Sequence, residues 1–111
     1  MAANPERGEV ELVIGEEKGV ICAEMGRLAA LSGSIGTKSL TDLFERAQGV
    51  EPLTVYAIID TMLIDGDLKA MRRAIKNPSD LAKVSAAFLK SLSFFIEGDD
   101  GKKGEGETET R

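Results

Sequence analysis

The residue types that most often carry out catalysis are scarce in this chain of 111 residues. It contains no histidine, which removes the commonest general base and the commonest metal ligand. Its single cysteine, Cys22, follows Val20 and Ile21 in an apolar run, where a thiol usually acts as a small hydrophobic side chain. Glu9 and Glu11 share one face of a predicted strand, and acids that alternate in this way are typical of its solvent-facing side. We therefore predict that the chain is not an enzyme and uses no cofactor or metal.

Two short segments superficially resemble ligand-binding loops. The segment "SGSIGTKS", residues 32–39, ends like a phosphate-binding loop, but Thr37 separates the glycine from the lysine that should follow it directly. The segment "DGDLKAM", residues 65–71, begins like a calcium loop, but the twelfth position is Lys76, where that loop needs a glutamate. We interpret the first segment as a linker between helices and the second as a helix-breaking turn.

Charge and hydropathy narrow the class of partner. The chain has 19 acidic and 14 basic residues, a net charge of −5. Residues 97–111 contain six acidic and three basic residues, a net charge of −3, so residues 1–96 carry a net charge of −2. Neither part has the excess of lysine and arginine that phosphate backbones require, so we predict no nucleic-acid partner. No apolar run approaches the roughly 20 residues of a membrane span, and the N-terminus lacks a secretory signal. A cytoplasmic protein without a membrane partner is expected.

The first part of the chain predicts a β-hairpin. Residues 7–14 alternate between apolar and polar side chains, which indicates a half-buried strand. Two glycines around three charged residues, at positions 15–19, are typical of a hairpin connection, and residues 20–24 follow as the returning strand. We therefore expect a hairpin over residues 7–24, preceded by a flexible N-terminus, residues 1–6.

Helical signals follow from residue 25 to residue 96. Ser39, Asp67 and Asn77 are predicted N-caps, and Pro52 and Pro78 suit first helical turns. The segment from Leu53 to Leu63 is apolar on more than one face, which indicates a helix that is central to the core or lies against a partner. Gly98 is expected to end the last helix, and residues 97–111 are too polar to fold. The predicted fold is α+β but mainly α: one domain, residues 7–96, with an N-terminal β-hairpin and four or five short helices, followed by a disordered acidic C-terminal tail.

Three apolar side chains are candidate partner-binding residues. Tyr56 and Met62 lie on the segment that is apolar nearly all round. Phe94 lies roughly 140° from the centre of the apolar stripe of the last helix, at about 100° per residue. An aromatic residue in that position indicates either an anchor in a protein–protein interface or a side chain covered by the hairpin or a neighbouring helix.

The order of motifs resembles a known family. Arg7-Gly8-Glu9-Val10, then Leu28-Ala29-Ala30-Leu31, then Gly36 with Ser39-Leu40 are similar to the gene-transfer-agent tail protein family, small proteins of tailed phages and gene transfer agents. The resemblance covers about the first half of the chain. It implies a tail assembly chaperone of the bacterial host cytoplasm, whose partners are the tape measure protein and, as a further candidate, the tail tube protein. The resemblance is also compatible with association of the chain into a homo-oligomer.

Two alternatives to the chaperone remain: a structural tail tube or tail completion subunit, and a small cytoplasmic adaptor or regulatory protein. The polar tail also has two interpretations. Gly101-Lys102-Lys103 fits a slippery codon run, as in chaperones made in two lengths by ribosomal frameshifting. An acidic tail that keeps the protein in solution is the other interpretation.

Overall fold

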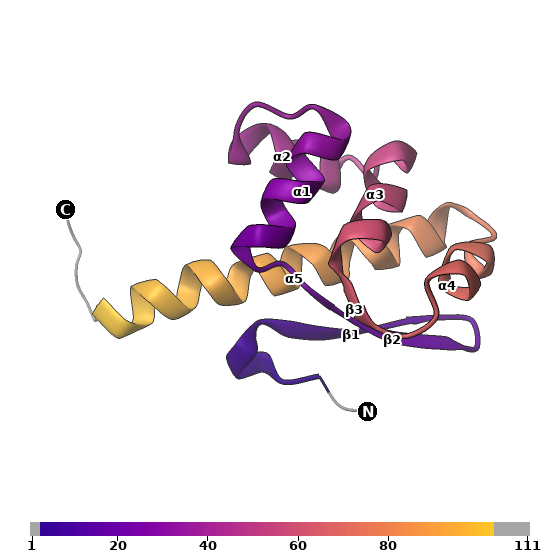
Figure 1. Ribbon diagram of the computed structural model, residues 1–111, viewed down its shortest axis with the longest axis horizontal. Coiled ribbons are helices and arrows are strands. Elements are labelled where there is room, and N and C mark those ends of the chain that lie inside the picture. Colours follow the sequence, from indigo (N-terminus) through magenta and orange to yellow (C-terminus); the bar gives the residue numbers. More distant parts are fainter. Residues whose placement is uncertain (1–2, 104–111) are drawn as a thin grey trace.

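The computed structural model describes residues 3–103, in which helices pack against one face of a three-stranded antiparallel sheet (Figure 1). This confirms a mainly α fold that begins with a β-hairpin. In chain order the elements are η1 (Pro5–Arg7), β1 (Glu9–Ile14), β2 (Glu17–Cys22), α1 (Met25–Ile35), α2 (Leu40–Gln48), α3 (Pro52–Met62), β3 (Leu63–Asp65), α4 (Leu68–Ala74) and α5 (Pro78–Lys103).

The hairpin turn is shorter than predicted. β1 and β2 pair with Ile14 opposite Glu17, so only Gly15 and Glu16 connect them. Gly15 has a φ of +61°, which is the conformation required of the first central residue in a type II′ turn. The predicted connection over residues 15–19 was wrong because the strand begins two residues after the first glycine.

A third strand was not predicted. β3 pairs with the free side of β2, which gives the sheet order β1-β2-β3. Gly19 makes this pairing fit, since a Cβ there would lie 2.8 Å from the carbonyl oxygen of Asp65. Three residues are too few to show a period of two, so the sequence alone gave no signal for this strand.

The predicted helix starts are confirmed by their side-chain caps. Ser39 Oγ accepts from the backbone N–H of residue 42 at 3.0 Å, and Asp67 Oδ1 accepts from that of residue 70 at 3.1 Å. Asn77 Oδ1 accepts from that of residue 80 at 3.1 Å. Each bond satisfies one of the backbone donors that a helix leaves free at its N-terminus.

Secondary structure continues beyond both predicted bounds of the domain. Asn4, expected in a flexible segment, caps η1 by accepting from the N–H of Glu6 at 3.0 Å. At the other end α5 continues through Gly98 to Lys103. A glycine inside a helix costs only about 1 kcal/mol relative to alanine and does not by itself end the helix. The remainder of the predicted tail, residues 104–111, lies outside the described residues.

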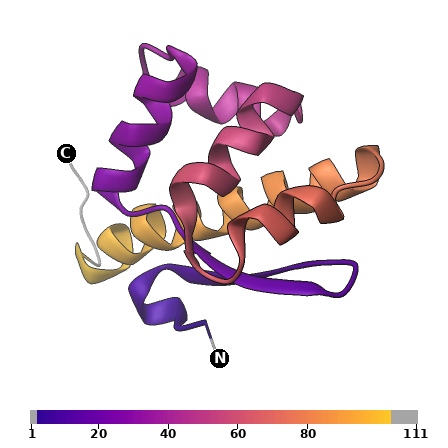
Figure 2. The same cartoon turned by 45° about the vertical axis from the view of Figure 1, so that its right-hand side comes forward.

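The core lies between the sheet and the helices, with α3 at its centre. Six of the eleven residues of α3 are buried, which explains why this segment is apolar on more than one face. In α5, Val84, Phe88 and Leu92 form the buried stripe. Figure 2 shows α1 rising away from the sheet, with α2 at its far end, while α5 runs along the sheet. No helix within residues 3–103 is long and apolar enough to cross a bilayer.

Candidate functional site

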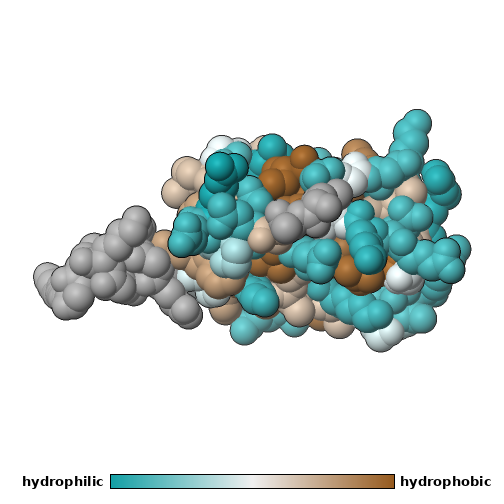
Figure 3. Space-filling model, turned by 90° about the horizontal axis from the view of Figure 1, so that it is seen from below, coloured by the Kyte–Doolittle hydropathy of each residue, from teal (hydrophilic) through white to brown (hydrophobic). Residues whose placement is uncertain are grey.

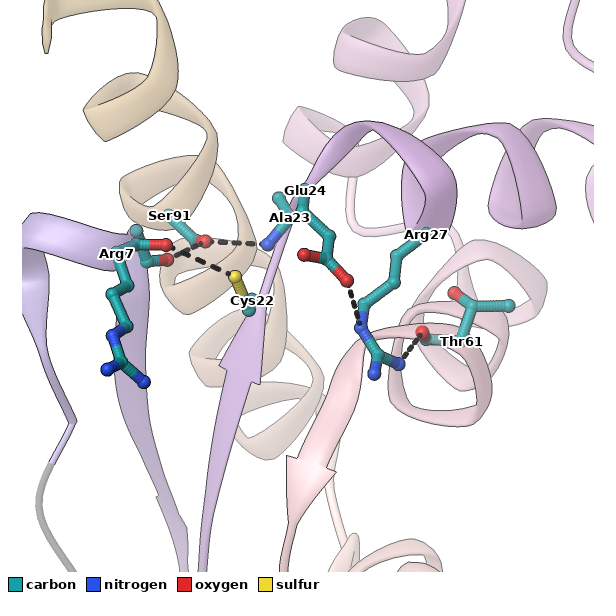
Figure 4. Close-up of polar contacts among 8 residues, drawn as sticks. Arg7, Cys22, Ala23, Glu24, Arg27, Thr61 and Ser91 are labelled. Atoms are coloured by element: carbon teal, nitrogen blue, oxygen red, sulfur yellow. Dashed lines mark hydrogen bonds and ion pairs between the residues drawn. The ribbon is translucent and has the colours of Figure 1, made fainter.

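The open end of the hairpin, opposite its turn, is joined to α5 by one hydroxyl group (Figure 4). Ser91 Oγ accepts from the N–H of Ala23 at 2.8 Å and donates to the carbonyl oxygen of Gly8. Because Glu9 pairs with Cys22, Gly8 and Ala23 would form the next pair of the ladder. The hydroxyl therefore takes the place of a ladder hydrogen bond, which is a structural role.

Cys22, next to this junction, is poorly suited to nucleophilic chemistry. It is buried, and its Sγ lies 3.4 Å from the carbonyl oxygen of Arg7 (Figure 4). Burial raises the pKa of the thiol above its usual value of 9.0, and the nearby carboxylate of Glu24 raises it further. The reactive thiolate is thus disfavoured at neutral pH. Glu24 is instead paired with Arg27, whose guanidinium also donates to the carbonyl oxygen of Thr61.

One of the three predicted partner-binding residues cannot contact a partner. Met62 is 0 % exposed, since it lies at the end of α3 where the helix enters the core. The prediction for Met62 was therefore wrong, because this side of α3 faces the core, while exposed residues such as Leu53 lie on another side of the helix. Tyr56 and Phe94 are half-buried. Phe94 packs against the core, and the guanidinium carbon of Arg72 lies 4.8 Å from the centre of the Tyr56 ring.

Tyr56 and Phe94 also do not belong to one surface. Tyr56 lies in a shallow cleft with Leu81, close to the start of α5. Phe94 follows Leu81 by 13 residues on the same helix, which corresponds to about 20 Å at 1.5 Å per residue. A single partner helix would have to run along about half the length of α5 to contact both residues. The structure therefore does not bring the predicted binding residues together.

Exposed apolar side chains gather instead at α1 and α2. Met25 is 77 % exposed, Leu40 50 % and Phe44 38 %. Between the two helices lies a groove of about 260 Å³ with a mainly apolar lining. Its lining residues are Met25, Leu28, Ala29, Ser32, Lys38, Ser39, Leu40 and Leu43. Leu28 and Leu43 are buried and form its floor, while Met25 and Leu40 stand at its rim.

Polar contacts hold the two helices of the groove in place. Arg46 on α2 donates from Nη1 to the carbonyl oxygen of Ile35, at the C-terminal end of α1, at 2.9 Å. Arg46 also pairs with Asp42 one turn earlier, with Nε and Oδ1 3.4 Å apart. In the loop, Ser32 Oγ donates to the carbonyl oxygen of Thr37 at 3.0 Å. The groove is therefore preformed, which lowers the entropic cost of filling it.

One cation lies at the rim of the groove. Lys38 is exposed, and among residues 3–95, whose side chains the structure describes, no carboxylate lies in ion-pair distance of its ammonium. The two arginines on these helices, Arg27 and Arg46, are half-buried and already paired with carboxylates. The site therefore combines an apolar floor with one uncompensated positive charge. In the same part of the chain no group of three His, Cys, Asp or Glu side chains could hold a metal ion.

The spacing of the apolar residues in α2 contains a signal for this surface. Leu40 and Phe44 are four residues apart, and so are Leu43 and Ala47, so the apolar stripe of α2 consists of two parallel rows. The structure buries the second row and leaves the first exposed. A nine-residue helix on the outside of a small domain can bury only one such row against its neighbours.

Comparisons of the chain with protein-family models, with curated proteins and with solved structures found no match.

Proposed function

We propose that this chain is a binding protein without catalytic activity that covers an amphipathic helix of another polypeptide. The resemblance of its first half to the gene-transfer-agent tail protein family suggests the role of a tail assembly chaperone, with the tape measure protein as its partner. The observation that supports the proposal best is the apolar groove between α1 and α2, with Met25 and Leu40 exposed at its rim.

The groove suits helix-in-groove recognition. An amphipathic helix presents apolar side chains at positions i and i+4, and such a pair can occupy the space over Leu28 and Leu43. Fully burying one Leu, Met or Phe side chain contributes about 1.5–3 kcal/mol. Covering the exposed parts of Met25, Leu40 and Phe44 would contribute on the order of 3 kcal/mol. Such a modest gain suits a chaperone, because its partner has to be released during assembly.

Charge would add selectivity to this surface. Lys38 favours a partner helix with an acidic residue near one end of its apolar row. The net charge of −5 on the whole chain disfavours acidic partners in general. A segment with one well-placed carboxylate among apolar anchors would satisfy both conditions.

The test compares two leucines that are exposed in first helical turns. Leu40 lies at the groove, and Leu53, 64 % exposed in the first turn of α3, lies outside it. The chain is co-expressed with a tape measure candidate, a long helical protein whose gene the proposal places just downstream of its own, and the soluble fraction of that protein is measured. We expect the wild type and Leu53→Glu to keep it in solution and Leu40→Glu to lose at least 80 % of the effect. Circular dichroism confirms that both variants are folded.

Two outcomes would overturn the proposal. If the wild-type chain does not keep the tape measure candidate in solution, the chaperone function is wrong. If Leu40→Glu and Leu53→Glu behave alike, binding does not use the groove. Mass spectrometry of purified particles gives a further check, since a chaperone is absent from the finished particle and a structural subunit is present.

A further inference from the structure

β1 forms one edge of the sheet, and its pairing with β2 determines which backbone groups face outward. Ile14 and Glu17 close the two-residue turn, so Val10, Leu12 and Ile14 are the residues that exchange hydrogen bonds with β2. Glu9, Glu11 and Val13 therefore direct their N–H and C=O groups away from the sheet. The contact of the Glu9 N–H with the carbonyl oxygen of Asn4, at 3.1 Å, confirms this direction.

Two residues of this edge remain available for pairing. η1 occupies the edge at Glu9, and the turn at Gly15 ends it on the other side. Between these limits, Glu11 and Val13 have no backbone partner within residues 3–103. Their side chains are exposed as well. Four backbone groups in a row, two donors and two acceptors, are therefore free to pair with a further strand.

We propose that a second copy of this chain pairs with β1 in the antiparallel direction, about a two-fold axis that passes between the two Leu12 residues. Glu11 of each copy then lies opposite Val13 of the other, and the two pairs form four backbone hydrogen bonds. The result is a continuous six-stranded sheet in the order β3-β2-β1-β1-β2-β3. This interaction goes beyond the proposed function, because the groove plays no part in it.

The positions of the outward-facing backbone groups of β1 select the two-fold axis at Leu12. They also suit a second copy of the same strand, because each free donor then meets a free acceptor. A two-fold axis at Glu11 would place two carboxylates opposite each other and would need the N–H of Glu9, which η1 already uses. An axis at Val13 would place Glu11 opposite Gly15, in the turn. Of the three two-fold arrangements within the edge, only the one at Leu12 uses all four free groups and separates the carboxylates.

The charges on the outer face of the sheet complement each other in this arrangement. Lys18 lies opposite Val13 within one copy, and Glu11 of the second copy would lie on the other side of Val13. The two charged residues are then two strand spacings apart, about 9.5 Å, which their long side chains can bridge. Both are exposed, and neither has an ion-pair partner in the part of the chain that the structure describes. Two-fold symmetry would form this pair twice.

The pairing is compatible with both the exterior of the sheet and the groove. Figure 3, which views the molecule from the sheet side, shows a mainly hydrophilic surface with separate hydrophobic areas, so the dimer would not stack through this face. The helical layer that carries α1 and α2 lies on the other side of the sheet (Figures 1 and 2). Both grooves of the dimer would therefore stay accessible.

The first test measures the molar mass of the full chain by light scattering after gel filtration at several concentrations. We expect a dimer for the wild type and for Val13→Thr, which keeps the N–H. Val13→Pro removes that outward donor and is expected to be monomeric, and proline is tolerated where the N–H of an edge strand faces solvent. A wild type that is monomeric up to millimolar concentration, or a folded Val13→Pro chain that remains a dimer, would overturn the proposal.

Cysteine variants test the register of the pairing, and this test remains valid even if the Val13→Pro chain does not fold. Opposed residues of a hydrogen-bonded pair have Cα atoms about 5.5 Å apart, which suits a disulfide. A mixture of E11C and V13C chains should therefore form a cross-linked dimer on oxidation, whereas E11C alone, with its cysteines about 8 Å apart, should not. Cross-linking of E11C alone would overturn the register.

Charge reversal tests the ion pair between Glu11 of one copy and Lys18 of the other. E11K should weaken the dimer at least tenfold and E11K/K18E should restore it; failure of this rescue would overturn the ion pair.

Discussion

Replacing Ser91 by alanine should lower the free energy of unfolding by about 3 kcal/mol. Ser91 is fully buried, and its hydroxyl is the only group within residues 3–103 that joins the N–H of Ala23 to the carbonyl oxygen of Gly8. The substitution removes two hydrogen bonds with a net contribution of about 1 kcal/mol each. It also leaves the buried N–H of Ala23 without a partner, at a cost of about 1–3 kcal/mol. Against a total stability of about 5–15 kcal/mol, this loss is large.

Urea unfolding followed by circular dichroism provides the measurement. With a slope of about 1.5 kcal/mol per molar urea, the midpoint of Ser91→Ala should fall by roughly 2 M. Ser93→Ala is the matched control, because Ser93 lies on the same helix at the surface and, among the described side chains, its hydroxyl donates only to the carbonyl oxygen of Lys90, at 2.7 Å. Its midpoint should change by less than about 0.3 M, since surface substitutions usually stay within 0.5 kcal/mol.

Hydrogen exchange of the Ala23 amide separates the proposed cause from a general loss of packing. If the hydroxyl protects this amide, its exchange should accelerate in Ser91→Ala more than that of amides in the middle of β2. A midpoint within 0.3 M of wild type would refute the reasoning. It would mean that Ala23 and Gly8 can close into a direct ladder bond once the hydroxyl is gone.

Three further substitutions test other features of the fold. Ser85→Ala should raise stability by about 1 kcal/mol in the same urea assay, because the buried hydroxyl of Ser85 has no partner in the described part of the chain; a loss would reveal a hidden bond. Gly8→Ala should cost about 3 kcal/mol, since φ is +79° and a Cβ would meet the ring of Phe95; an unchanged midpoint would contradict this contact. Because the pKa of Cys22 is raised, the unfolded chain loses its thiol proton first as pH rises above 9.0. The wild type should therefore lose more stability than Cys22→Ala between pH 8 and pH 10, and parallel curves would count against a buried neutral thiol.

The sequence predicted those features that depend on a few neighbouring residues. Ser39, Asp67 and Asn77 cap helices through contacts to residues three positions away, so each pattern contains both partners. The alternation of apolar and polar residues in β1 was equally local, because successive side chains of a strand point to opposite faces of the sheet and only one face is buried. The overall class, a hairpin followed by helices, followed from these signals together.

Features that depend on distant partners could not be predicted in the same way. β3 has only three residues and forms because β2 offers a free side, to which its residues pair 42 and 45 positions away in the chain, and because Gly19 leaves room for the carbonyl oxygen of Asp65. The role of Ser91 depends on a hydrogen bond that is missing between Gly8 and Ala23 at the end of the hairpin, and Ala23 lies 68 residues away in the chain. Neither has a period or a motif in the sequence. The two-residue turn at Gly15 was closer to prediction, but the second glycine of the segment suggested a longer loop.

The location of the exposed apolar surface shows the same limit for function. Met62 and Met25 are equally apolar, yet one is fully buried and the other is 77 % exposed. Periodicity identifies which residues share a face of a helix, but it does not say whether another element covers that face. The apolar character of α3 was assigned to either the core or a partner, and the fold uses it for the core. The surface that remains for a partner lies on α1 and α2, where the sequence analysis placed no partner-binding residue.

The same separation between core and groove makes Ser91 a control for the proposed function. Its contacts are to Gly8 and Ala23 at the sheet, whereas the groove is lined only by residues of α1, α2 and the loop between them. At a temperature well below its unfolding transition, Ser91→Ala should therefore keep the tape measure candidate in solution as well as the wild type does, although it is much less stable. Leu40→Glu should show the reverse pattern, with little loss of stability and loss of binding, because Leu40 is half exposed. If Ser91→Ala instead lost the partner while still folded, the binding surface would have to include the sheet, and the assignment of the site to α1 and α2 would be wrong.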